Sequence, residues 1–515
     1  GLVKLGVAAK LTDVLDAAGV AYDVFDQVPP DSSMDVVNEV ARLYAARGCD
    51  GFVAIGGGSV IDTTKGAAAS LACEGVDFAT LQGSEILHAD LPPFIAVPTT
   101  AGTGSEVTLV AVVADTKKHA KLSFTSYKLV PHAAILDPAL TASLPPKLTA
   151  TTGMDALTHA IEAYTSIQKN PVSDAFAVKA IELIAANLPV ACRDGANVDA
   201  RTSLALGSLM AGAAFSNAMV GIVHALGHSL GGLCHIPHGQ AMMMLLPHCV
   251  AFNVKRGIHK GLYGELLPHL APARAAGLSP DASDEERDRA FSEHLFSLND
   301  LYHERYGVPL TLSELGVARD QLPAVAKQAR YDDIADVYSK SYFYQRVRDI
   351  LVRNPATSYD ILCSDIEDFK LINDTIGIVA GDRLLRQVGK LHASLLGDHG
   401  ICGRLSADRF ACLIEHREDY SDEMFTQSTA RIKSGFGNRN VVLKYGIYRV
   451  EDREVPVEQM CDRALLAVQS IKGQYGKHFA FYDDKLRDTL LHRQAITDGM
   501  ERALASGQFE VYLQP

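Results

Sequence analysis

The sequence lacks several features that mark common classes of protein. It has no uninterrupted run of about 18 apolar residues and no recognisable signal peptide, so we expect no membrane segment and a cytoplasmic location. Its nine cysteines form no Cys-x-x-Cys pair, which predicts free thiols in a reducing compartment. A net charge of −13 argues against nonspecific binding to nucleic acid or anionic membranes. Repeats and low-complexity runs are also missing, and 515 residues predict three or four globular domains.

Histidines and one aspartate gather in two short parts of the sequence. Asp155 and His159 stand four residues apart where apolar residues have helical spacing, so both side chains project from one helix face. His224 and His228 repeat this spacing, and His238 follows them. One carboxylate with three neutral imidazoles suits Fe(II), Zn(II) or Co(II), which polarise a substrate oxygen. The alternative is polar packing or phosphate contacts, but two matched spacings favour a metal site.

Two glycine-containing loops precede these residues. The apolar run 52–55 leads into Gly-Gly-Gly-Ser at 56–59 and then into helical spacing, which predicts a strand, a turn and a helix N-terminus. Unpaired backbone N–H groups at such a turn can hold a pyrophosphate. A second apolar run, 94–97, leads into a loop of small and hydroxyl residues at 98–106. Each loop alone could be an ordinary turn, but both lie ahead of one predicted metal site, which favours a nucleotide-binding role.

Four motifs together resemble the iron-dependent, or group III, alcohol dehydrogenases. They are Gly-Gly-Gly-Ser-x-x-Asp-x-x-Lys at 56–65, Pro-Thr-Thr-Ala-Gly-Thr-Gly-Ser-Glu at 98–106, Gly-Met-Asp-Ala-Leu-Thr-His-Ala-Ile-Glu at 153–162 and the block 224–239. The resemblance covers residues 1–332. It implies the dehydroquinate synthase-like fold, in which an α/β nucleotide-binding domain precedes an all-helical metal domain. The implied reaction transfers a hydride between a small primary alcohol or aldehyde and NAD or NADP, with Fe(II) or Zn bound in the cleft.

The resemblance also implies roles for individual residues. The implied metal ligands are Asp155, His159, His224 and His238. The implied cofactor-binding residues are Gly57, Gly58, Ser59, Asp62, Thr99, Thr100 and Lys121. His228 would lie beside the nicotinamide and the substrate as a proton-relay residue, whereas His235 and His248 have no role in the pattern and are interpreted as structural. The resemblance further leads us to expect a homo-oligomer assembled through the dehydrogenase part.

The dehydrogenase pattern is expected to be shortened at both ends. The opening Gly-Leu-Val-Lys-Leu-Gly resembles a position past the first β-α unit, which normally carries the acidic residue that reads the ribose. The sequence therefore leaves NAD and NADP open. The pattern stops at 328–332, before the last helices expected of the family.

Beyond residue 332 the sequence resembles the GGDEF domain of diguanylate cyclases, an α/β nucleotide cyclase-like fold. The segment 362–374, with its Asp365 and Asn373, and the later Gly381-Asp382 carry the resemblance. The signature turn reads Ser-Ala-Asp-Arg-Phe at 406–410, so Asp365 and Asp408 keep the carboxylates expected to hold Mg²⁺.

Two changes in the signature turn indicate that this domain is degenerate. Ser406 and Ala407 stand where glycines let the backbone approach phosphates, and Arg409 places a cation where the family has an acid. The Arg-x-x-Asp feedback site would fall at 397–400, which reads Gly-Asp-His-Gly. We therefore expect a GTP-binding or scaffolding role, with Mg²⁺ and GTP retained as candidate ligands, and no synthesis of cyclic di-GMP.

The expected domains are 1–150 (nucleotide-binding), 151–332 (helical, metal-binding), 333–486 (GGDEF) and 487–515 (the linker helix and first strand of an EAL phosphodiesterase domain). Three hypotheses follow from this layout. The chain is an alcohol dehydrogenase, a cyclic-di-GMP signalling protein with a dehydrogenase-like sensor, or a chimeric join without an integrated function. The abrupt change near residue 332, without a Pro-, Gly- or Ser-rich linker, is the observation behind the third.

Overall fold

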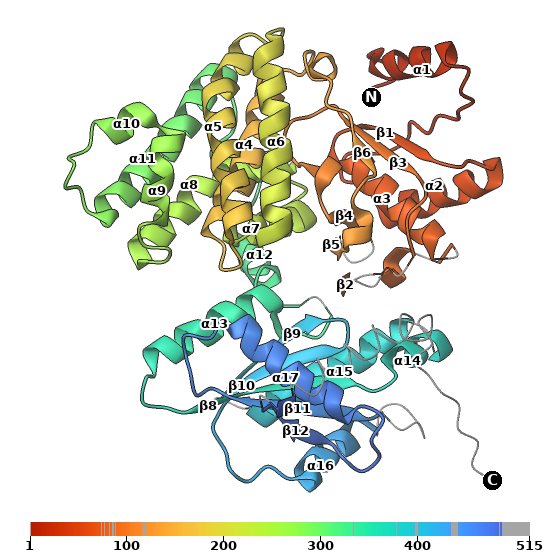
Figure 1. Cartoon of the computed structure of the whole chain (residues 1–515), viewed down its shortest axis with the longest axis vertical. Helices are drawn as coiled ribbons and strands as arrows, with labels where there is room; N and C mark the ends of the chain where they lie inside the picture. Colours follow the sequence, from red (N-terminus) through yellow and green to blue (C-terminus); the bar gives the residue numbers. More distant parts are fainter. Residues whose placement is uncertain are drawn as a thin grey trace, which may run out of the picture. The chain divides into compact units, whose positions relative to one another are not determined.

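The structure is a computed structural model that describes residues 2–486 except 74, 77, 82, 85–86, 88, 117–119, 333, 377, 397–399, 434–440 and 484. The chain divides into two compact units, Gly1–Ala329 and Arg330–Pro515 (Figure 1). The predicted EAL segment 487–515 and most of the predicted feedback stretch lie outside the described residues.

The first unit begins with an α/β part in which two loops leave one edge of a parallel sheet. Strands β1 and β3 are parallel and in register, with Gly56 opposite Pro98, and β6 pairs with the other side of β3. Their carboxyl ends therefore meet at the same edge, where the two glycine-containing loops follow. A second sheet has the order β2-β5-β4. The elements of this part are α1 (Val7–Ala17), α2 (Met34–Arg47), β1 (Phe52–Gly56), α3 (Gly58–Ala72), η1 (Phe78–Leu81), β2 (Gly83–Ser84), β3 (Phe94–Pro98), η2 (Ser105–Val107), β4 (Val110–Asp115), β5 (Ala120–Thr125), η3 (Tyr127–Leu129), β6 (Ala133–Ala134) and η4 (Pro138–Leu140).

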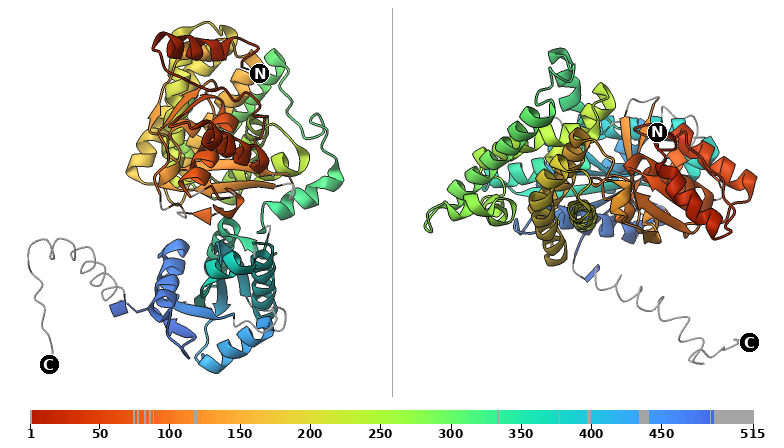
Figure 2. Two further views of the ribbon diagram at one scale, coloured as in Figure 1. Left: turned by 90° about the vertical axis from the view of Figure 1, so that its right-hand side faces the viewer. Right: turned by 90° about the horizontal axis from the view of Figure 1, so that it is seen from above.

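The rest of the first unit is helical. Helices α4, α5 and α6 pack side by side, and Figure 2 shows them from two further directions. Alanines and glycines on their facing surfaces allow this close packing, and α7 and α8 follow with the second group of histidines. The elements are α4 (Pro146–Thr165), α5 (Pro171–Arg193), α6 (Val198–Ala218), α7 (Ile222–Cys234), α8 (His238–Arg256), α9 (Leu262–Leu270), α10 (Pro272–Ala276), α11 (Asp284–Tyr306), η5 (Arg319–Gln321) and α12 (Leu322–Gln328).

Helix α5 is long and apolar enough to cross a membrane by length and composition. Helices α6 and α7 pass the same test only as one pair, bent by 103°. Charged residues such as Lys179 and Glu182 interrupt α5, which is why the sequence shows no uninterrupted apolar run. Its residues Ile181 and Ile184 are buried in the core shared with α4 and α6, so α5 is a core helix of this bundle.

The second unit is a six-stranded sheet covered by helices on both faces. The strand order is β12-β11-β8-β10-β9-β7, and β8 lies between two antiparallel neighbours. Helices α15 and α16 contribute to the core on one face, and α13 and α17 to the core on the other. The elements are β7 (Tyr338–Ser339), α13 (Lys340–Arg353), β8 (Tyr359–Ile366), α14 (Phe369–Ile376), α15 (Ile378–Leu396), β9 (Gly400–Ser406), β10 (Arg409–Glu415), α16 (Asp422–Lys433), β11 (Leu443–Arg449), α17 (Val457–Ile471) and β12 (Phe479–Phe481).

Candidate metal and nucleotide site

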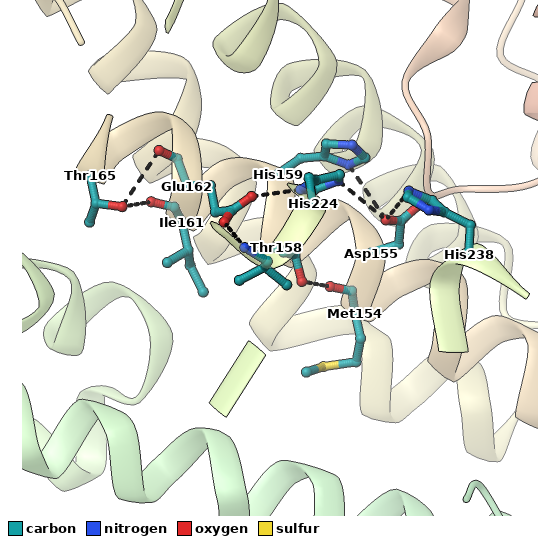
Figure 3. A network of polar contacts seen from close by, with 10 residues as sticks. Met154, Asp155, Thr158, His159, Ile161, Glu162, Thr165, His224 and His238 are labelled. Carbon is teal, nitrogen blue, oxygen red and sulfur yellow. Dashed lines mark hydrogen bonds and ion pairs between the residues drawn. The ribbon is translucent and has the colours of Figure 1, made fainter. Parts of the chain in front are cut away.

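Three helices bring the four predicted metal ligands together. Asp155 and His159 come from α4, His224 from α7 and His238 from the first position of α8. One ligand atom from each lies within 4.8 Å of the others. Asp155 Oδ1 is 3.9 Å from His159 Nδ1, 3.9 Å from His224 Nε2 and 3.5 Å from His238 Nε2, as Figure 3 shows. The i, i+4 spacing on α4 therefore does place both side chains on one face.

The chemical state of the cluster fits a divalent cation. Asp155 Oδ1, His159 Nδ1 and His224 Nε2 are buried and have no hydrogen-bond partner, although they face one another. Buried polar atoms are normally paired, so three unpaired atoms at one point indicate a missing positive ligand. Burial lowers the pKa of His224 to about 3 and raises the pKa of Asp155 to about 8. The imidazoles are thus neutral, as metal ligation requires. A bound cation would compensate the negative charge of the Asp155 carboxylate.

Glu162 orients one of these ligands and was missed by the sequence analysis. Its Oε2 lies 2.6 Å from His224 Nδ1, and its Oε1 accepts a hydrogen bond of 2.7 Å from the backbone N–H of Val223. The buried carboxylate therefore caps the start of α7 and fixes the His224 ring so that Nε2 faces the cluster. The signal was available in the sequence, because Glu162 lies seven residues after Asp155 and so returns to the same helix face.

We expect Glu162→Gln to weaken divalent metal binding by roughly 10- to 100-fold, the range for partners that orient a ligand. The amide keeps the size of the side chain but lacks the negative charge that favours Nδ1–H on His224. Isothermal titration with Co²⁺ measures the change. Glu265→Gln is the matched control, because Glu265 accepts a hydrogen bond from Tyr164 at the surface. Equal affinity of Glu162→Gln and the wild type would show that Glu162 serves only to cap the helix.

The two predicted nucleotide loops lie against each other at the edge of the β1-β3-β6 sheet. The Thr99 N–H donates a hydrogen bond of 2.9 Å to the Gly56 carbonyl. A Cβ on Gly57 would lie 3.2 Å from Thr100 Oγ1, and a Cβ on Gly58 would lie 2.7 Å from Thr103 Cγ2. Close packing of the two loops therefore disfavours a side chain at residue 58, because Thr103 would have to move. The first loop leads into the N-terminal end of α3, and the second loop lies beside it. Backbone N–H groups without a partner at a helix N-terminus favour the binding of an anion.

The second loop also contacts the metal helices. A Cβ on Gly102 would lie 3.0 Å from Thr152 on α4, the helix that carries Asp155 and His159. Gly104 has φ +61°, and a Cβ there would lie 2.7 Å from the Cα of Gly212 on α6. The loop and the helical bundle thus meet backbone to backbone, and the loop also packs on α4, which supplies two of the four predicted metal ligands.

Lys121 connects the two predicted sites. Its Nζ forms an ion pair of 2.5 Å with Asp31, and its side chain is only 8% exposed. A Cβ on Gly231 of α7 would lie 3.2 Å from this Nζ, so Lys121 reaches the helix that carries His224 and His228. Asp31 also donates its backbone N–H to Ser59 Oγ at 3.2 Å. No motif in the sequence indicated Asp31, because its partners are 28 and 90 residues away.

His228 is half-buried on α7, one turn after His224. Its ring centroid is 5.3 Å from that of His238 and 5.9 Å from that of His224. Burial lowers its pKa to about 3, and the neighbouring His224 contributes to the lowering. A neutral imidazole beside the cluster can accept a proton. His235 is exposed at the C-terminal end of α7 and His248 is exposed on α8, and neither belongs to the cluster.

Asp62 points into the protein. Its Oδ1 accepts a hydrogen bond of 2.5 Å from Ser105 Oγ, and its Oδ2 accepts one of 3.0 Å from the Val112 N–H. The neighbouring Lys65 is fully buried and donates to both the carbonyl and the hydroxyl of Thr108. Asp62 and Lys65 therefore hold α3 against the second loop and β4. Asp62 supports the loops through these two contacts.

In the second unit, the two predicted metal carboxylates lie together beside two cations. Asp365 lies near the end of β8, and Asp408 lies in the turn between β9 and β10. Asp365 forms ion pairs of 2.7 Å with Lys472 and 3.5 Å with Arg409. Burial and then the charge of Asp365 raise the pKa of Asp408 to about 6, and its Oδ2 accepts a hydrogen bond from the Ile366 N–H. Two cationic side chains thus already face the carboxylate expected to hold Mg²⁺.

The other two predicted residues of this domain are Asn373 on α14 and Asp382 on α15. Asn373 lies against Gly381, the residue before Asp382.

The degenerate turn keeps a conformation that suits glycine. Ala407 has φ +43°, in the left-handed region that non-glycine residues rarely adopt. We expect Ala407→Gly to raise the free energy of unfolding of the second unit by about 1 kcal/mol, because the strain at Cβ is removed. Ala411→Gly in β10 is the control of opposite sign, since a buried strand residue loses its methyl group there. Chemical denaturation of the full chain measures both, and destabilisation by Ala407→Gly would contradict the strain argument.

An α/β nucleotide-binding part joined to a helical part with an Asp-His-His-His cluster defines a metal- and nucleotide-dependent enzyme. Three family models match the chain. "Iron-containing alcohol dehydrogenase" matches residues 1–138, "Fe-containing alcohol dehydrogenase family, C-terminal" matches 149–353, and "Diguanylate cyclase, GGDEF domain" matches 329–478. The last two overlap over residues 329–353. The structure assigns α13 in this overlap to the second unit, because Phe343 and Val347 are buried in its core.

Several known proteins similar to the first unit are dehydrogenases of alcohols or reductases of aldehydes. The 1,3-propanediol dehydrogenase of Klebsiella pneumoniae is 39% identical over 330 residues, which are 64% of this chain and 82% of that protein. The lactaldehyde reductase of Escherichia coli (strain K12) is 38% identical over 337 residues, 65% of this chain and 84% of that protein. The crystal structure of a 1,3-propanediol oxidoreductase aligns with a TM-score of 0.58 at 38% identity, over 63% of this chain and 82% of the other.

The chain belongs to the iron-containing alcohol dehydrogenase family and also carries a GGDEF domain. Family membership makes the first unit an oxidoreductase that uses NAD(P) and iron. The sequence-based prediction of this family, of its two-part fold and of its cofactors is confirmed.

Proposed function

We propose that the first unit interconverts small primary alcohols or diols and their aldehydes, with NAD or NADP as the hydride carrier. The observation that carries this proposal is the close packing of the second loop on the helical part, made by Gly102 against Thr152 of α4 and by Gly104 against Gly212 of α6. It brings a predicted pyrophosphate site and a predicted Lewis-acid site into one place. The relatives named for 1,3-propanediol and lactaldehyde support a small hydroxylated substrate.

In this proposal Asp155, His159, His224 and His238 hold one Fe²⁺ or Zn²⁺ ion, which when bound polarises the substrate oxygen. The N–H groups of the Gly57-Gly58-Ser59 turn bind the pyrophosphate, and Thr99 and Thr100 line the nucleotide site. Lys121, which forms an ion pair with Asp31, adds a positive charge to the nucleotide site. Orientation of two bound reactants contributes roughly 7–11 kcal/mol to lowering the barrier, so the loop contacts are as important as the ion.

His228 is proposed to move the substrate proton. Its ring lies 5.3 Å from that of His238 and 5.9 Å from that of His224, and a neutral imidazole has one ring nitrogen with a lone pair that can accept the proton of the alcohol. Its place one turn from His224 puts it beside the cluster. In the reverse direction the same nitrogen returns the proton to the product alcohol.

The test is oxidation of 1,3-propanediol and reduction of lactaldehyde by the iron-loaded chain, followed by NAD(P)H absorbance. We expect turnover by the wild type and a loss of kcat of about 10²- to 10⁴-fold in His228→Ala, the range for general acid–base catalysis. His235→Ala is the control, because His235 is exposed outside the cluster. Cofactor and metal binding without turnover of any small alcohol or aldehyde would overturn the proposed reaction.

We further propose the domain limits 1–150, 151–332, 333–486 and 487–515, a homo-oligomer formed by the dehydrogenase part, and a cytoplasmic location. The described residues contain no disulfide, which supports a reducing compartment. Light scattering coupled to size-exclusion chromatography tests the oligomer.

For the second unit we propose a scaffolding or GTP-binding role without synthesis of cyclic di-GMP. The observation in favour is the pairing of Asp365 with Lys472 and Arg409, which puts cations where catalysis would need a metal.

A further inference from the structure

A second cluster of metal-ligating side chains lies in the core of the second unit. Cys402 on β9 and Cys412 on β10 are directly opposite each other in the antiparallel register. His392 comes from α15, which covers this face of the sheet. One ligand atom from each of the three residues lies within 4.8 Å of the others. The exposed fractions are 3% for His392, 7% for Cys402 and 2% for Cys412, so solvent does not satisfy these groups.

The polar groups at this cluster are poorly satisfied within the protein, and Cys402 Sγ donates only a long hydrogen bond of 3.9 Å to the Gly403 carbonyl. His392 Nδ1 is buried without a hydrogen-bond partner, and Nε2 is 3.5 Å from Ser364 Oγ, at the limit for a hydrogen bond. The hydroxyl of Tyr445, from β11, is also buried without a partner. Tyr445 belongs to the same core as Cys402 and Cys412, and burial raises the pKa of its hydroxyl. Unpaired buried polar groups are uncommon, and each calls for a physical cause.

Apolar packing or a disulfide would account for only part of the cluster. Buried cysteines often act as small apolar residues, but apolar packing gives the buried imidazole no partner. A disulfide across β9 and β10 would consume both sulfurs and would still leave His392 Nδ1 without a partner. A cation bound by two thiolates and one imidazole accounts for all three side chains.

We propose that His392, Cys402 and Cys412 form a binding site for one thiophilic d¹⁰ cation, with Zn²⁺ as the preferred occupant. Soft thiolates select zinc over magnesium or calcium, and Zn–S and Zn–N bonds of about 2.3 and 2.0–2.1 Å fit ligand atoms this close together. Binding releases the two thiol protons to solvent and transfers no electrons. The site ties α15 to β9 and β10, close to the degenerate turn at 406–409. It is independent of the proposed dehydrogenase function.

The test exploits a chemical difference between the two metal sites. The dehydrogenase cluster offers only oxygen and nitrogen, so a thiolate-to-cobalt charge-transfer band reports the second site alone. We expect the reduced full-length chain to bind two Co²⁺ ions and to show this band. Cys402→Ser and Cys412→Ser should each remove the band and lower the cobalt content by one ion. His224→Ala should lower the content by one ion and keep the band.

Cys363→Ser is the matched control, because Cys363 is also buried in this sheet but packs into the core on the opposite face. It should retain the band. A measurement on the wild type covers the case that a variant does not fold: in mild denaturant, Zn²⁺ should slow alkylation of Cys402 and Cys412 several-fold more than alkylation of Cys363. One cobalt ion per chain without the band, or equal alkylation with and without Zn²⁺, would overturn the proposal.

Discussion

Replacing His224 by alanine should leave the chain with almost no metal at the dehydrogenase site. His224 supplies a ligand atom that is buried, unpaired and within the cluster, and its loss also leaves Glu162 as a buried carboxylate without its imidazole partner. The loss of affinity should exceed the roughly 10- to 100-fold expected for Glu162→Gln, since an orienting partner contributes less than a ligand. Competition titration with a chromophoric chelator under anaerobic, reducing conditions measures the affinity for Fe²⁺ and Zn²⁺.

His248→Ala is the matched control, because His248 is an exposed histidine on α8, the helix that begins with His238. It should bind metal as tightly as the wild type. If His224→Ala retains the wild-type affinity, the ligand assignment is wrong.

The second unit should form no cyclic di-GMP from GTP and Mg²⁺, even after long incubation. Arg409 and Lys472 neutralise Asp365, and the side chains of Ser406 and Ala407 occupy the turn that phosphates would have to approach. A variant with Ser406→Gly, Ala407→Gly and Arg409→Glu restores the Gly-Gly-Asp-Glu signature and removes one of the two cations. Nucleotide chromatography of both full-length proteins, side by side, measures the product.

Product from the restored variant alone would place the defect in these three side chains. Product from the wild type would refute the degeneracy argument. Absence of product from both would indicate a further defect, and adding Lys472→Ala to the restored variant tests whether the ion pair of Lys472 with Asp365 is its cause. Ala407 already has the left-handed backbone conformation of a glycine, so the restoring changes require little movement of the turn.

The parts of the site that depend on local spacing could be predicted from the sequence, and those that depend on distant contacts could not. The i, i+4 pair Asp155 and His159 and the glycine turn at 56–59 carry their geometry within a few residues. By contrast, Asp31 acquires its role only when β5 brings Lys121 next to it, 90 residues away. The prediction that Asp62 belongs to the cofactor site rests on its place in a motif, and the structure adds that its two oxygens accept hydrogen bonds from Ser105 and Val112.

The second unit shows the same limit. The sequence identified its altered signature, because the change lies within five consecutive residues. It did not indicate that Lys472, far beyond Asp365 in the chain, forms an ion pair with that carboxylate. Nor did it connect His392 with two cysteines, since the cluster exists only once α15 packs on the strands.

The backbone contact between Gly104 and Gly212 restricts how this enzyme can be altered by recombination. The two residues come from different halves of the dehydrogenase, and neither can carry a side chain without pushing the other away. In a chimera with its nucleotide-binding half from one relative and its helical half from another, both residues 104 and 212 would have to be glycine. Gly104 and Gly212 must therefore be inherited together, and engineers who exchange cofactor specificity between relatives should treat them as one unit.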